Sequence, residues 1–237
     1  MADNSPRRLY DWINWLITIP WKAARRMQAH YEYRFVKPGK FVFRGKEYVY
    51  LNHPYNLAYQ CERAVEIPIV WSKFQGVEGK ILEIGNTLSH YYQANHEIID
   101  KYETGTEIIN EDFMRFNPQA RYDLIVSIST IEHIGFDEEP QDKTKTQEAL
   151  KNIERLLSKK GCAIVTVPFP YNPELDDIIA RKRIAGWDWG FLMKIGAREW
   201  VEVSIEKAKT AKFNYPFPHA NCIAVGVFNN AEWGPKP

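Results

Sequence analysis

From Lys80 onward, short continuous runs of apolar residues alternate with a segment of helical periodicity. The apolar runs are 80–85, 122–128, 162–168 and 221–228, and the helical pattern covers Thr146–Ser158. Continuous apolar runs are typical of strands that are buried on both faces, as in a parallel sheet covered by helices. We therefore expect an α/β fold in which a mostly parallel sheet carries helices on both faces.

The front of the chain has a different composition. Residues 1–75 hold 12 Lys and Arg against 6 Asp and Glu, and 15 of the 33 aromatic residues. We expect residues 1–76 to form an appendage with an N-terminal helix and a hairpin, and 77–237 to form the main domain. The hairpin should pair Phe41–Phe43 with Tyr48–Tyr50.

The segment Ser5–His30 reads as one or two helices that break at Pro20. Either this segment packs on the domain, or residues 5–30 form a lid or make a peripheral membrane contact. Its apolar stretch is too short to span a bilayer and lacks the features of a signal peptide.

The formal net charge is +1, which gives no reason to expect a nucleic-acid partner. The three cysteines are far apart and form no zinc-binding or disulfide pattern, which favours a reducing, cytoplasmic environment and predicts no metal site. The sequence leaves the oligomeric state open.

Polar residues follow four of the expected strands. Glu83 closes the first strand and Gly85-Asn86 follows it, Asp100 closes the second, and Glu111-Asp112 follow the third. Ser129 and His133 come after the fourth. Ligands bind outside the carboxyl ends of strands in a parallel sheet, and acids there suit a ligand rich in hydroxyls and amines.

Residues 80–169 resemble a class I S-adenosylmethionine-dependent methyltransferase, a Rossmann-like domain. The resemblance lies in KILEIG, Asp100, NEDF, YDLIVSISTIEHI, LLSKKG and CAIVTVPF, in that order. It implies S-adenosylmethionine as the cofactor. It also implies contacts from Glu83 to the methionine amino group, from Asp100 to the ribose, and from Asp112 or Glu111 to the adenine amine. Gly85, Asn86 and Ser129 are further implied cofactor contacts.

The chain departs from the family pattern at two places. Of the glycines in ExGxGxG only Gly85 is present, with Thr87 and Ser89 at the later positions. Asp100 and Glu107 are also too close for a crossover helix between parallel strands. Either that helix has been lost, or residues 88–102 form the first helix and 107–111 the second strand, which would make Glu111 or Asp112 the ribose acid. We favour the first alternative, because the spacing from Asp112 to Asp123 fits the third-to-fourth-strand step of relatives.

His133 faces the place where relatives hold the methyl acceptor. It is either a general base or substrate-orienting group, or a capping or packing histidine. The acidic run Asp137, Glu138, Glu139 and Asp142 reads as a solvated loop. No Asn/Asp-Pro-Pro-aromatic motif follows the fourth strand, which favours a small-molecule or sugar hydroxyl as acceptor.

Two further questions stay open in the sequence. Trp187 and Trp189, with Tyr171 and Phe191, could stack on a sugar or ring, or belong to the core. The alternative to an active enzyme is a methyltransferase-like binding or scaffolding protein, because the glycine loop is depleted. A nicotinamide-dependent oxidoreductase is disfavoured, because no GxGxxG follows a strand.

Overall fold

The fold is that of a computed structural model, which describes residues 24, 27–28, 30–31 and 33–229. Its centre is an eight-stranded sheet with the order β5-β4-β3-β6-β7-β10-β8-β9. The strands are β3 (Ile81–Ile84), β4 (Glu97–Ile99), β5 (Ile108–Ile109), β6 (Tyr122–Ile128), β7 (Leu157–Pro168), β8 (Trp187–Gly196), β9 (Glu199–Val203) and β10 (Cys222–Phe228).

The sheet is mostly parallel. Strands β5, β4, β3, β6 and β7 pair in parallel, and β10 lies antiparallel between β7 and β8. Because β8 is antiparallel to β10, it runs in the direction of β7, and only β10 and the edge strand β9 are reversed. The predicted mostly parallel sheet is confirmed.

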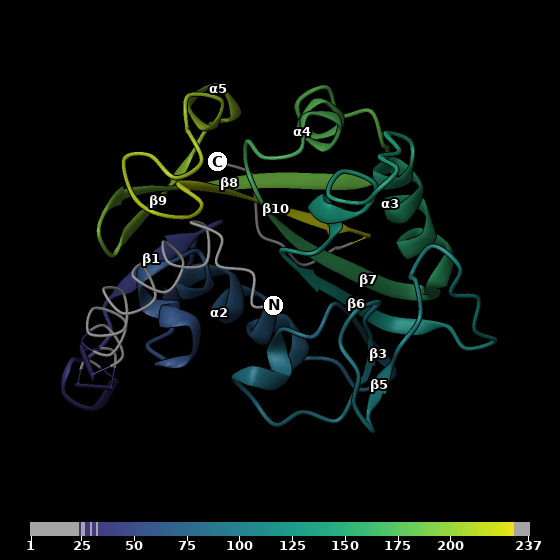
Figure 1. The fold of residues 1–237 in the computed structure, drawn as a ribbon, viewed down its shortest axis with the longest axis horizontal. Coiled ribbons are helices and arrows are strands. Elements are labelled where there is room, and N and C mark those ends of the chain that lie inside the picture. Colours follow the sequence, from purple (N-terminus) through teal and green to yellow (C-terminus); the bar gives the residue numbers. More distant parts are fainter. Residues whose placement is uncertain (1–23, 25–26, 29, 32, 230–237) are drawn as a thin grey trace, which may run out of the picture.

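Helices cover both faces of this sheet, as expected (Figure 1). On one face lies α2 (Arg63–Phe74), and on the other lie α3 (Lys145–Leu156) and α4 (Pro173–Ala180). Shorter helices are α5 (Ile205–Ala208), η1 (Tyr55–Gln60), η2 (Leu88–His90) and η3 (Ile131–His133). Side chains of β6 alternate between the two layers: Val126 packs with the α2 side and Ile125 with the α3 side.

The predicted hairpin is present, with β1 (Lys40–Phe43) antiparallel to β2 (Lys46–Val49). Its turn needs a left-handed residue, and Gly45 has φ +72° there. Phe41, Phe43 and Tyr48 are buried in the same cluster as Val65 of α2. The hairpin therefore shares a core with the sheet, and the division at residue 76 remains a prediction from composition.

The predicted helix at Ser5–His30, with its membrane or lid role, falls almost entirely outside the described residues. Among the residues that the structure does describe, none of the helices combines the length and the apolar character that a bilayer crossing requires.

The structure settles how β4 connects to β5. The two strands pair in parallel, Ile98 with Ile108, and residues 100–107 between them contain no helix. The favoured alternative, loss of this crossover helix, is confirmed. A short connection suffices because β5 has only two residues, so the chain has little distance to cover before it pairs again.

Two local features follow from the course of the chain. Helix α3 ends without a glycine cap, because the chain passes from Leu156 directly into β7 and Gly161 lies within that strand. Of the two alternatives left open for Trp187, the structure supports the core: the residue lies in β8, is 7% exposed, and its indole N–H donates to Glu154. A paired strand and a satisfied indole place this residue in the core.

Candidate functional site

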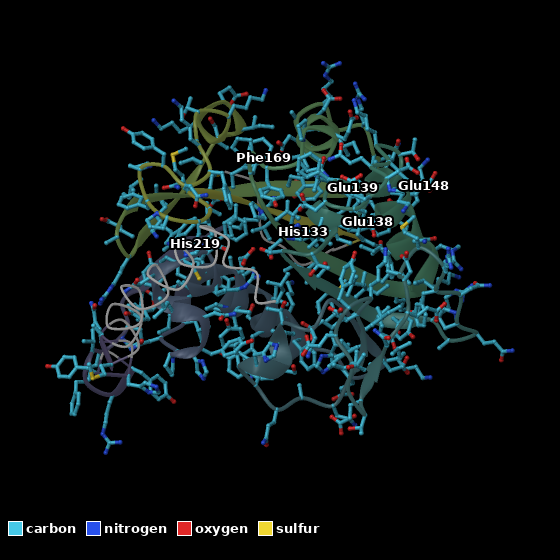
Figure 2. All side chains as sticks on the ribbon, in the orientation of Figure 1. His133, Glu138, Glu139, Glu148, Phe169 and His219 are labelled. Atoms are coloured by element: carbon cyan, nitrogen blue, oxygen red, sulfur yellow. The ribbon has the colours of Figure 1, made fainter. Side chains whose placement is uncertain are left out.

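A cavity of about 320 Å³ opens at the carboxyl ends of β3, β4, β5 and β6. The chain moves from β3 toward β4 and β5 on one side and toward β6 and β7 on the other, so β3 and β6 flank the switch point of the sheet. The volume of the cavity is within the range of small-molecule sites. The lining residues are Ile84, Gly85, Ile99, Asp100, Lys101, Tyr102, Glu111, Asp112, Phe113, Thr130, His133, Ile134, Asp137 and Glu138; Figure 2 labels His133 and Glu138 among the side chains.

Glu83 lies beneath the cavity and not in its wall. Its carboxylate is fully buried, and Oε1 accepts hydrogen bonds from the amides of Thr87 (2.8 Å) and Leu88 (2.7 Å). Oε2 lies 2.7 Å from Nε2 of His96. The carboxylate of Glu83 therefore holds the first loop in shape, and its contact with a methionine amino group stays a prediction.

The first loop needs a glycine at one position. Gly85 has φ +83°, and a Cβ atom there would lie 2.3 Å from Oγ1 of Thr130. The backbone of the loop thus approaches the segment after β6 closely, and both residues line the cavity. Asn86 does not line the cavity: its amide N lies 3.3 Å from Oδ2 of Asp100, and its side chain donates to Glu103 at 2.9 Å.

Asp100 closes β4 and lines the cavity, as predicted for a residue at this strand end. Oδ1 accepts the amides of Tyr102 (2.7 Å) and Glu103 (2.8 Å), which forms the turn after the strand. Within the described part of the chain, Oδ2 accepts only the longer bond from Asn86. A carboxylate oxygen has two acceptor sites, so Oδ2 retains capacity for a ligand hydroxyl.

Ion pairs cross the cavity wall. Nζ of Lys101 lies 3.2 Å from Oδ2 of Asp112 and 2.5 Å from Oε1 of Glu138, while Lys145 approaches the other oxygen of Glu138 at 2.9 Å. The hydrogen bond to Glu138 raises the pKa of Lys101 above its usual range. The pairs join the loop after β4 to the loop after η3. Glu111 also lines the cavity and is exposed.

His133 lies at the end of the cavity nearest β7. Its Nδ1 is hydrogen-bonded to Oδ2 of Asp137, which also accepts the hydroxyl of Tyr171 at 2.9 Å. An ionised carboxylate can only accept, so Nδ1 donates this bond, and in the neutral ring Nε2 carries the lone pair. Burial and the bond to Asp137 raise the pKa of Tyr171 to about 12, so its hydroxyl stays protonated as the donor.

A buried acid lies beside this group. Glu132 is 1% exposed, and neither of its carboxyl oxygens has a hydrogen-bond partner in the described part of the chain. Burial raises its pKa well above the usual range, which favours the neutral form of the carboxyl. Its Oε1 lies 3.6 Å from Nε2 of His133.

Ser129 is turned away from the cavity. Its backbone has φ +44°, and its hydroxyl donates to Oε1 of Glu66 at 2.8 Å. Glu66 is fully buried and pairs with Arg63. The hydroxyl of Ser129 therefore connects the end of β6 to α2, and its cofactor contact stays a prediction.

The structure thus brings Gly85, Asp100, Glu111, Asp112 and His133 to one cavity, and Glu83, Asn86 and Ser129 are not among the residues that line it. Sequence reasoning missed Asp137 and Glu138, which it assigned to a solvated loop. The spacing of four residues between His133 and Asp137 was the available signal for that pair. Nothing in the sequence indicates the bond to Tyr171, 34 residues away.

Comparisons with known proteins give matches among solved structures only. No family model matches the chain, and no curated protein does. The N-methyltransferase NodS from Bradyrhizobium japonicum, in complex with S-adenosyl-L-homocysteine, is 14% identical, with a TM-score of 0.39 and coverage of 72% of this chain and 92% of NodS.

Two other solved structures are similar to the same extent. An S-adenosylmethionine-dependent methyltransferase from Clostridium acetobutylicum is 13% identical, with a TM-score of 0.36 and coverage of 68% of this chain and 88% of that one. TehB from Haemophilus influenzae is 14% identical, with a TM-score of 0.43 and coverage of 70% and 62%. Identities and scores this low carry no information about chemistry. By the order and direction of its strands, the chain has a Rossmann-like α/β fold.

Proposed function

We propose that the protein is an S-adenosylmethionine-dependent methyltransferase that acts on a hydroxyl group of a small molecule or sugar. One observation carries the proposal: two acids, Asp100 and Asp112, line a single cavity at the switch point of the sheet. They come from neighbouring strand ends, after β4 and β5. Such a position suits a nucleoside whose hydroxyls and amine donate to carboxylates.

The residues present fit this cofactor. Oδ2 of Asp100 is available for ribose hydroxyls. Asp112 would accept an exocyclic amine with its remaining lone pairs, because Oδ2 also pairs with Lys101 and Oδ1 also accepts the amide of Met114. Ile99, Phe113 and Ile134 line the same cavity and supply an apolar wall for a flat base. Gly85 keeps the first loop close without filling the space.

His133 would serve as the base. The cofactor supplies an electrophilic methyl group, and the protein has to place an acceptor oxygen beside it and remove the proton of that oxygen. Asp137 accepts the hydrogen bond from Nδ1 and orients the ring, so Nε2 of the neutral imidazole is the atom that would take this proton. Asp137 then lies next to the imidazolium cation that results and stabilises it.

Calorimetric titration with S-adenosylmethionine and S-adenosylhomocysteine tests the proposal. We expect both to bind, and we expect Asp100→Asn to weaken binding by roughly tenfold to a hundredfold, the effect of losing hydrogen bonds to a charged acceptor. The amide keeps an oxygen for the turn amides of Tyr102 and Glu103, so the loop should persist. Glu107→Gln, on an exposed residue of the same connection, should leave the affinity unchanged.

A binding or scaffolding module is the competing function. It is favoured by the first loop, in which the amides of Thr87 and Leu88 are committed to Glu83 and so are not offered to a ligand. If neither nucleoside binds at millimolar concentration, the methyltransferase proposal is wrong and this second function stands.

A further inference from the structure

Three aromatic rings form a cluster that contacts His133 through Tyr171. The ring of Tyr171 meets His133 edge to face, with 5.5 Å between the ring centroids. Phe136 and Phe213 in turn meet Tyr171, at centroid distances of 5.8 Å and 5.2 Å. The three rings come from three separate segments: the loop after η3, the turn after β7, and the connection from α5 to β10. The aromatic wall, as we name Phe136, Tyr171 and Phe213, is thus assembled only by the fold.

The wall is incomplete toward solvent. Phe213 is 41% exposed although it contacts Tyr171. An exposed phenyl ring is unremarkable alone, but this one belongs to a chain of rings that ends on the proposed base. An aromatic ring of a ligand that packs on Phe213 would remove the exposed face of Phe213 from water and form an aromatic pair with it.

We propose that the methyl acceptor is a phenol, whose ring packs on Tyr171 and Phe213 and whose hydroxyl faces Nε2 of His133. The proposal rests on the methyltransferase function proposed above and narrows its acceptor to an aromatic alcohol. A sugar hydroxyl or an aliphatic alcohol is the alternative that the experiment below distinguishes.

The chemistry of the base agrees with this choice. Imidazole is a weak base, and a phenol loses its proton near pH 10, as tyrosine does, far more readily than an alkyl alcohol. In the transfer, the O–H proton passes to Nε2 of His133 and an oxygen lone pair forms the new C–O bond. The bond between sulfur and the methyl carbon breaks, and its electron pair stays on sulfur. The products are a methyl ether, the thioether form of the cofactor and an imidazolium, so charge and atoms balance.

The experiment compares phenol with cyclohexanol, a ring of similar size that lacks π faces, and with methyl glucoside. Binding of each is measured by ligand-observed NMR titration, with and without S-adenosylhomocysteine, and methyl transfer is measured separately with labelled S-adenosylmethionine. The variants are Phe213→Leu and, as a matched control on a 65% exposed phenyl elsewhere, Phe35→Leu.

We expect phenol to bind about threefold to tenfold more tightly than cyclohexanol, the effect of an aromatic pair, and Phe213→Leu to abolish that preference. Phe35→Leu should retain it. Equal binding of phenol and cyclohexanol, preferential binding of the glucoside, or a phenol preference that survives Phe213→Leu would each overturn the proposal. Loss of nucleoside binding with the phenol preference intact would refute the methyltransferase function and leave the aromatic subsite standing.

Discussion

Asp176 in the first turn of α4 offers a test of the electrostatics beside the aromatic wall. Its Oδ2 accepts the amide of Tyr171 at 3.0 Å, while Oδ1 is buried without a hydrogen-bond partner in the described residues. Burial raises the pKa of this carboxyl from 3.8 to about 7. We predict that Asp176→Asn stabilises the protein at pH 8 and not at pH 4.

The sign follows from proton linkage. An acid whose pKa is higher in the folded state contributes stability that is fully present below pH 3.8 and is lost as pH rises toward 7. About three pKa units correspond to an upper limit of about 4 kcal/mol. Asp176 is only partly buried, and a charge near a helix N-terminus gains about 0.3–1 kcal/mol, so we expect a gain of about 2 kcal/mol at pH 8. The asparagine oxygen still accepts the amide of Tyr171.

Urea unfolding at pH 4, 6 and 8 measures this gain as the difference in free energy of unfolding between variant and wild type. Asp177→Asn is the control, because that neighbouring carboxylate pairs with Arg181 and Arg183 at the surface. This control should give no gain at pH 8. A gain for Asp176→Asn that is the same at all three pH values, or a loss at pH 8, would refute the reasoning.

Two other predictions concern the cavity. Gly85→Ala should lower the free energy of unfolding by about 2 kcal/mol more than Gly45→Ala in thermal or urea unfolding. Both glycines have positive φ, but only at position 85 would the new Cβ meet a neighbour, Oγ1 of Thr130 at 2.3 Å; equal losses would contradict the assigned clash. Glu132→Gln should raise stability increasingly from pH 5 to pH 8, because burial raises the pKa of Glu132 and the wild type must keep it protonated. A loss of stability at pH 8 would show that the carboxylate has a partner that we have not identified.

Much of the sheet could be predicted because its central strands are continuous apolar runs. The predicted bounds of β6, Tyr122–Ile128, are those of the structure. Strand β8 was not predicted, because Trp187, Asp188 and Gly190 interrupt its apolar pattern. Its pairing with β10 stabilises it as a strand, and the sequence alone does not show this pairing.

Only those residues of the candidate site that directly follow a strand could be predicted from the sequence. Asp100 and Asp112 follow strands directly, so topology alone brings them together. The partners of His133 depend on how two loops pack, and Asp137 and Tyr171 meet only after β7 is in place. Glu83 has the expected position, but its two oxygens are used within the loop, which side-chain geometry alone reveals.

The lost helix between β4 and β5 has a consequence for access to the cavity. In its place, Nδ2 of Asn110 lies 3.0–3.1 Å from the carbonyl oxygens of Asp100, Lys101 and Glu103, and the side chain of Asp100 closes the same turn. The connection between β4 and β5, which forms one side of the cavity entrance, is therefore held to the sheet at both of its ends. The opposite side, around Glu138, is joined to it by the ion pair between Lys101 and Glu138, which is partly exposed and therefore weakened by salt. Ligand entry and release should thus occur by movement of the Glu138 side, and both rates should increase with ionic strength.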